Sequence, residues 1–110
     1  MLANQIAAEN VVTVKNLLSA FEGESNANAK YTEFARRADA DGLHGAASLF
    51  RAAARAEHIH ATNHARVIRR LGSEVTAKIN TVQVKSTLEN LKEALGGRAV
   101  RDRHDVSRVS

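Results

Sequence analysis

Apolar and small side chains recur every three or four residues along the first part of the chain, which is the spacing of one face of an α-helix. This spacing predicts a helix from about Thr13 to Asp39. The positions that share its face are Val14, Leu17, Phe21, Glu24, Asn28, Tyr31, Ala35 and Ala38. The next residues have the composition of a turn, in which Gly42 suits a left-handed conformation after a helix.

The same spacing returns after the turn and predicts a second helix from about Leu43 to Leu71, ended by Gly72. Its expected buried stripe consists of Phe50, Ala53, Glu57, His60, His64, Val67 and Leu71. At 1.5 Å per residue each helix would be about 40 Å long, a length typical of four-helix bundles. Two such helices joined by a short turn pack antiparallel, but alone they cannot enclose a core.

The last part of the chain predicts one more short element. An extended connection from Gly72 to Gln83 leads to Ser86-Thr87-Leu88-Glu89, which has the serine and glutamate of a capping box. We expect a short helix from there to Leu95, so that residues 1–95 form one all-α unit. Residues 96–110 have no helical or strand period, and we expect them to be a disordered tail.

Composition narrows the classes of function. The 110 residues include no cysteine, which excludes disulfides, zinc ribbons, iron–sulfur clusters and rubredoxin-type iron sites. No apolar run approaches the roughly 20 residues that span a bilayer, and no signal-peptide pattern is present, so we expect a cytoplasmic protein with no membrane partner. The net charge is +4, but basic residues alternate with acidic ones along the long helices, and nucleic acid is not an expected partner.

The candidate chemistry lies on the expected buried stripe of the second helix, where Glu57 and His60 are one turn apart. An unpaired carboxylate in an apolar seam costs several kcal/mol, so such residues usually have a partner there. Residues three apart point in similar directions, and carboxylate oxygen with imidazole nitrogen suits iron, manganese or zinc. Glu24, on the face of the first helix, is a further candidate ligand.

Each candidate has a structural alternative. Glu57 and His60 could be a solvent-facing pair, and Glu24 could be a carboxylate at the edge of the seam. Tyr31, two turns after Glu24, could be a core aromatic residue or could hydrogen-bond a metal-binding carboxylate. We expect His64, one turn beyond His60, to support the ligands or pack against them rather than bind the metal.

These segments resemble the rubrerythrin family. The segment from Asn16 to Ala35 is similar to the first helix of rubrerythrins, in which the glutamate of a Gly-Glu-Ser segment binds iron and a tyrosine seven residues later lies near the metals. The segment Ala56-Glu57-His58-Ile59-His60-Ala61 resembles the second helix with its Glu-x-x-His pair. Val84 to Leu95 resembles the start of the third helix, where the likeness ends.

The resemblance implies a ferritin-like four-helix bundle with a di-iron site. The chain carries neither the second helix pair of the family nor a rubredoxin domain with cysteine ligands. Because the two halves of such a bundle are related by an approximate two-fold axis, two copies of this hairpin could form an isologous homodimer. Each copy would supply Glu24, Glu57 and His60, with Tyr31 and His64 behind them, to two iron ions per dimer, or to manganese or zinc.

The function implied by the resemblance is that of a ferritin-like di-iron oxidoreductase, which reduces peroxide or oxidises ferrous iron at the shared site. A peroxidase of this kind would need an external electron-donor protein. The alternative hypothesis is a non-catalytic metal-binding or structural helical dimer, a truncated rubrerythrin remnant. The sequence leaves the two hypotheses open.

Overall fold

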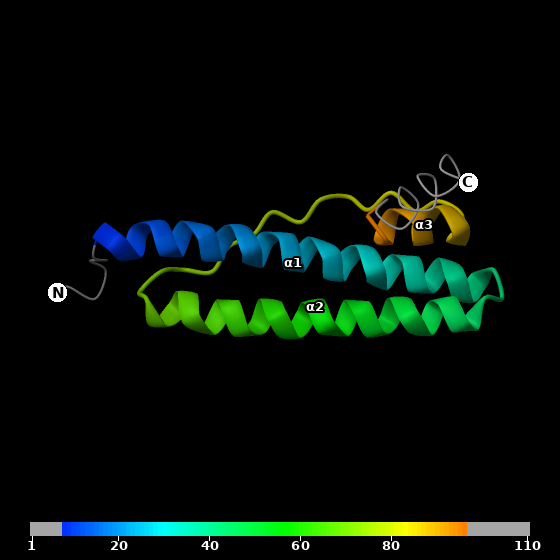
Figure 1. The fold of residues 1–110 in the computed structure, drawn as a ribbon, viewed down its shortest axis with the longest axis horizontal. Coiled ribbons are helices and arrows are strands. Elements are labelled where there is room, and N and C mark those ends of the chain that lie inside the picture. The colour runs from blue at the N-terminus through cyan, green and yellow to red at the C-terminus, as the bar shows by residue number, and fades with distance from the viewer. Residues whose placement is uncertain (1–7, 97–110) are drawn as a thin grey trace, which may run out of the picture.

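The computed structural model describes residues 8–96, which form three α-helices and no strand (Figure 1). These helices are α1 (Ala8–Ala40), α2 (His44–Arg70) and α3 (Thr87–Ala94). The predicted all-α hairpin with a short third helix is therefore confirmed. No helix in the described range is long and apolar enough to span a membrane. The expected disordered tail, residues 96–110, lies outside the described part except for Gly96.

Both long helices end at a glycine in the left-handed conformation, as the sequence predicts. At Gly42, with φ of 76°, the Leu43 amide donates to the Ala38 carbonyl (2.8 Å) and the Gly42 amide to Asp39 (3.0 Å). The same two bonds recur around Gly72, whose φ is 90°. This pattern is the Schellman motif, which satisfies the last carbonyls of a helix and reverses the chain.

The helix boundaries differ little from the predicted ones, except at the start of α1. Within the described residues this helix already runs from Ala8, five residues before the predicted Thr13, and no glycine or proline interrupts the chain between them. At α3, Ser86 Oγ accepts from the Glu89 amide (3.1 Å), and Glu89 Oε1 accepts from the Ser86 amide (3.3 Å). The predicted capping box is therefore confirmed.

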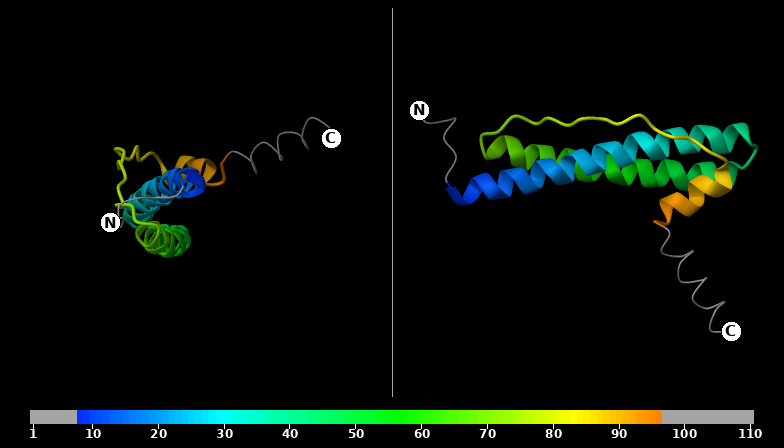
Figure 2. Two further views of the ribbon diagram at one scale, coloured as in Figure 1. Left: turned by 90° about the vertical axis from the view of Figure 1, so that its left-hand side faces the viewer. Right: turned by 90° about the horizontal axis from the view of Figure 1, so that it is seen from above.

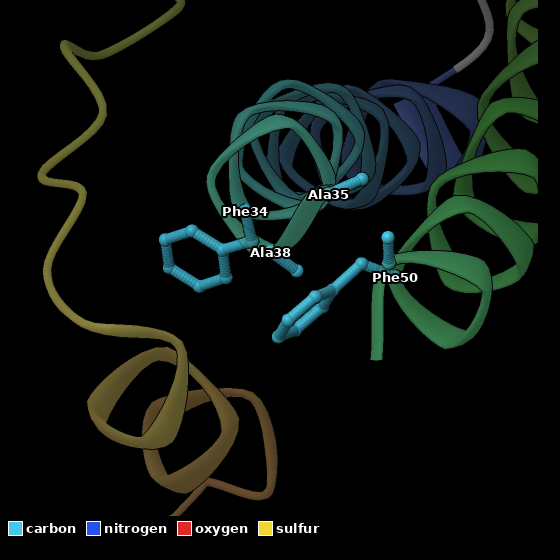
Figure 3. Packing of buried hydrophobic residues seen from close by; sticks show 5 residues of the cluster. Phe34, Ala35, Ala38 and Phe50 are labelled. Carbon is cyan, nitrogen blue, oxygen red and sulfur yellow. The ribbon is translucent and has the colours of Figure 1, made fainter. Parts of the chain in front are cut away.

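The core lies at the turn end of the hairpin, where α3 lies beside α1 (Figure 2). The rings of Phe34 and Phe50 meet edge to face there, with centroids 5.3 Å apart (Figure 3). Phe34 is fully buried although it lies off the predicted stripe of α1. Its burial has a long-range cause, since Val82 of the extended segment and Leu91 of α3 cover that side of α1.

The predicted buried stripe of α2 is only partly right, because Phe50 is buried and His60 and Val67 are exposed, while the other predicted positions are half-buried. Small residues dominate the face that packs against α1, and the buried positions are Ala47, Phe50, Ala54, Ala61, Ala65 and Ile68. Of the predicted stripe, Val67 is 40% exposed and the His60 side chain 58% exposed. Alanine lets the two backbones approach closely, so α1 packs on the alanine row and leaves the neighbouring face of α2 open.

An extended segment returns the chain along α1 from the far end of α2 to the turn end (Figure 1). The Asn26 side chain holds this segment as a neighbouring strand would, because its amide donates to the Lys78 carbonyl (2.8 Å) and its oxygen accepts from the Asn80 amide (2.6 Å). At the turn, the Thr87 hydroxyl donates to Asp41 Oδ2 (2.8 Å) and fastens the start of α3. These contacts decide where α3 covers the hairpin.

The Thr87 hydroxyl, and next to it Arg37, hold the pKa of Asp41 below its ordinary value of 3.8. A carboxyl whose pKa is lower in the folded state contributes stability above its unfolded-state pKa and loses it as the pH falls through the folded-state value. We therefore expect the docking of α3 to weaken as the pH falls below about 4. The NMR chemical shift of the Thr87 methyl group, followed as the pH is lowered, measures this docking.

Two variants distinguish the contribution of the Asp41 carboxyl from that of the Glu89 carboxyl in the cap of α3. Asp41→Asn should remove most of the acid-induced shift of the Thr87 resonance, whereas Glu89→Gln should leave it in place. An unchanged acid shift in Asp41→Asn would contradict the assignment.

Candidate metal centre

Glu24 lies in the middle of α1 and is held by a residue of the opposite helix. Its side chain is 18% exposed, and its Oε1 lies 2.7 Å from Nδ1 of His64 on α2. An ionised carboxylate can only accept hydrogen bonds, so Nδ1 of His64 is the donor. The two residues are roughly equally far from the turn at Gly42, which is the only sequence signal that pairs them.

Glu57 and His60 are one helical turn apart on α2, but they do not hold each other. His60 Nδ1 lies 3.7 Å from Glu57 Oε1, which is too long for a hydrogen bond. Glu57 is 28% exposed and His60 58% exposed. In the single chain His60 therefore faces solvent, as the structural alternative has it, while Glu57 is half-buried and keeps both oxygens available.

The structure does not gather the three predicted ligands around one point. Within residues 8–96, no group of three or more histidine, aspartate or glutamate side chains could hold a metal ion. The candidates divide instead into two pairs, Glu24 with His64 and Glu57 with His60. One chain offers part of a donor set and not a complete centre.

The donor types themselves fit a divalent transition metal. Two partly buried carboxylates and imidazole nitrogen are the ligands that iron, manganese and zinc accept. Glu57 and His60 also continue a row that begins with Leu49 and Ala53, since residues three and four apart share a helix face. Leu49 is 68% exposed. His60 therefore lies on the side of α2 that α1 leaves uncovered, whereas Glu57, between Ala54 and Ala61 of the buried row, lies at the edge of that side.

An apolar groove that the sequence did not predict includes Ala53 in its lining, one helical turn before Glu57. It has a volume of about 400 Å³ and lies where α1, α2 and α3 meet. Its lining residues are Tyr31, Leu49, Phe50, Ala53, Leu91, Ala94 and Leu95. The groove depends on where the extended segment places α3, and helix periodicity alone carries no signal of that placement.

Tyr31 forms one wall of the groove. Its ring stacks on Phe50 at an interplanar angle of 21° and meets Phe34 edge-on, with both centroid distances 6.4 Å. This arrangement agrees with the reading of Tyr31 as a core aromatic residue. No hydrogen bond to its hydroxyl occurs within the described residues, so the predicted contact with a metal-binding carboxylate is not present in the single chain.

Comparison with known proteins places these features in a family. The family model described as rubrerythrin matches residues 15–101. A rubrerythrin of Porphyromonas gingivalis is 38% identical over 85 residues, which are 77% of this chain and 42% of that protein. Rubrerythrin-2 of Clostridium acetobutylicum is 31% identical over 93 residues, which are 84% of this chain and 50% of that protein.

A third relative matches over a shorter stretch. Nigerythrin of Nitratidesulfovibrio vulgaris is 50% identical over 48 residues, which are 44% of this chain and 24% of that protein. No solved structure matches the chain. The chain spans half or less of the length of these relatives, but the family model covers most of its own residues. By this coverage, the chain belongs to the rubrerythrin family.

Proposed function

We propose that two copies of this chain form a four-helix bundle that binds two metal ions between them, iron first and manganese or zinc as substitutes. Each copy would supply Glu24, Glu57 and His60. The observation that carries the proposal is the position of half-buried Glu57 at the edge of the open side of α2, and of exposed His60 within that side, where Ala53, one turn before Glu57, lines an apolar groove. A face with both apolar area and metal-binding side chains fits a partner that brings the same face in return.

The groove supports a second copy as the occupant. Large apolar side chains lie exposed at its rim, with Leu49 68% and Leu95 53% exposed. Exposed apolar area of this kind marks an interaction surface in soluble proteins. In a two-fold dimer each groove would receive the equivalent side chains of the other copy, and the two half-sites would face each other across the axis.

The charge balance of the shared site favours bound cations. Glu24 and Glu57 of two copies would bring four carboxylates into one interior, where their mutual repulsion disfavours association. Two divalent ions neutralise this charge, so metal binding and dimer formation should support each other. His64 keeps one oxygen of Glu24 engaged, while Glu57 and His60 remain free to adjust to the ions.

The reaction we propose is that of a di-iron oxidoreductase, either peroxide reduction or oxidation of ferrous iron. A pair of iron ions, when bound, supplies two electrons to an oxidant. The chain's own residues hold the ions and limit access of water, since Tyr31 and Phe50 wall the adjoining groove. For repeated peroxide reduction, an electron-donor protein would have to return the electrons.

A metal-binding or structural dimer without turnover is the second candidate. Its basis is that the ligands are scattered in the single chain, where no group of three forms within residues 8–96, so that a dimer need not assemble a working centre. A non-catalytic metal-binding dimer would share both the dimer and the metal with the first candidate and differ only in catalysis. A purely structural dimer would share the dimer alone.

The dimer is tested by placing a charge at the rim of the groove. Leu49→Glu would bury an unpaired carboxylate, which costs several kcal/mol, and should weaken dimerisation about 100-fold or more. Ile59→Glu is the matched control, because Ile59 is also exposed on α2 (51%) but does not line this groove. Light scattering should give about twice 11.9 kDa for the unchanged chain and for Ile59→Glu, and the monomer mass for Leu49→Glu. A metal-loaded chain that stays monomeric would contradict the proposal.

The metal site is tested by anaerobic titration with ferrous ion. The unchanged chain should bind two ions per dimer, and its melting temperature should rise because binding to the folded state adds stability. Glu57→Ala should abolish two-metal binding, since it removes one carboxylate from each half of the site. Lys92→Ala, a change on the exposed side of α3, should bind as the unchanged chain does. An equal melting temperature with and without excess metal would count against the site.

Catalysis is tested by counting peroxide against iron. With a chemical reductant in excess, the iron-loaded dimer should consume many equivalents of hydrogen peroxide per iron, and Glu57→Ala with the same added iron should consume about as little as free iron does. Consumption limited to the bound iron would leave the non-catalytic metal-binding dimer as the function.

A further inference from the structure

His64, which is not one of the proposed ligands, hydrogen-bonds the proposed ligand Glu24. We propose that His64 is a positioning residue that presets Glu24 for the metal, so that Glu24 is the fixed ligand of the site while Glu57 and His60 are the mobile ones. This inference rests on the proposed metal-binding function. It concerns how one ligand is oriented before any ion binds.

The geometry of the contact is that of a strong hydrogen bond. The 2.7 Å separation of Nδ1 and Oε1 is short, as expected when a donor meets an ionised acceptor. The Glu24 side chain is sheltered, at 18% exposed, whereas that of His64 is 34% exposed, so water competes poorly for the carboxylate. The bond joins α1 to α2, and it therefore fixes the carboxylate relative to both helices.

The bond leaves half of the carboxylate unused. Oε2 of Glu24 accepts no hydrogen bond within the described residues, so one oxygen is tethered and the other is available to a cation. Ordered side chains behind a ligand raise metal affinity because the ligand need not be immobilised when the ion binds. Glu57 has no such support, since its nearest imidazole nitrogen is 3.7 Å away.

The same bond also holds the helices together, and this second effect has to be separated from positioning. Asn28 supplies a comparison within the same helix pair, because its Nδ2 donates to the Ala54 carbonyl at 2.7 Å and touches no candidate ligand. Loss of either bond should loosen the hairpin, but only loss of the His64 bond should release a ligand.

The test is a titration with Co²⁺, monitored by visible absorption. It compares the unchanged full chain with three variants of it, His64→Leu, His64→Asn and Asn28→Ala. His64→Leu should weaken Co²⁺ binding about 10- to 100-fold while leaving two ions per dimer at saturation. His64→Asn should restore most of the affinity, since the Asn amide nitrogen occupies the place of Nδ1 and can donate to Oε1. Asn28→Ala should lower the melting temperature and leave the Co²⁺ affinity and spectrum unchanged.

Other outcomes overturn the inference in distinguishable ways. Equal Co²⁺ affinity in His64→Leu and the unchanged chain would show that His64 does not position Glu24, with the proposed metal site intact. A loss in His64→Asn as large as in His64→Leu, with a changed Co²⁺ spectrum, would make His64 a ligand through Nε2 instead. Absence of Co²⁺ binding by the unchanged chain would overturn the proposed function and this inference together.

Discussion

Helix α2 has more apolar and functional surface than one neighbouring helix can cover. Its alanine row, with Ala54 and Ala61 at the centre, packs against α1 and brings the two backbones close together. The adjacent face, which begins with Leu49 and has Glu57 at its edge, has α3 as its only neighbour within residues 8–96, at one end. Apolar surface left in water costs roughly 25 cal/mol per Å². The uncovered face is therefore the feature on which the proposed assembly and the proposed chemistry both depend.

The chemical character of this face restricts what could cover it. An apolar partner alone would bury Glu57 without compensation, and an isolated buried carboxylate is strongly unfavourable. Solvent alone would leave Leu49 and the groove exposed. A second copy together with divalent cations meets both requirements, because the copy supplies apolar area and the cations neutralise the carboxylates. This shared requirement is the physical reason for linking dimer formation to metal binding.

Local chemistry made several features of the fold predictable from the sequence. Gly42, Gly72 and Ser86 end or begin helices through hydrogen bonds to residues only a few positions away, so the sequence contains the whole cause. The buried stripe of α2 was predicted only in part, because Ala53 and Ala54 are equally small and neighbouring, and periodicity cannot choose between the faces they occupy. Phe34 was missed because its cover comes from residues about 50 positions later in the chain.

The candidate site likewise has features with a local cause, which the sequence predicts, and features with a long-range cause, which it does not. The one-turn relation of Glu57 and His60 follows from helix geometry, and the sequence predicted it. The bond between Glu24 and His64 depends on the register of two helices, which is set by the packing of small residues and by the turn. The sequence suggested a supporting role for His64 but not its partner. Completion of the site depends on what covers the open face, and residues 8–96 of one chain do not contain that information.

Native mass spectrometry during a ferrous titration measures association and metal content in the same ion. Iron should appear only on a species of twice the chain mass, with two ions per dimer, and the dimer population should grow as iron is added. Iron bound to the monomer, or a dimer that stays metal-free in excess iron, would contradict the claim that the site is shared between two copies.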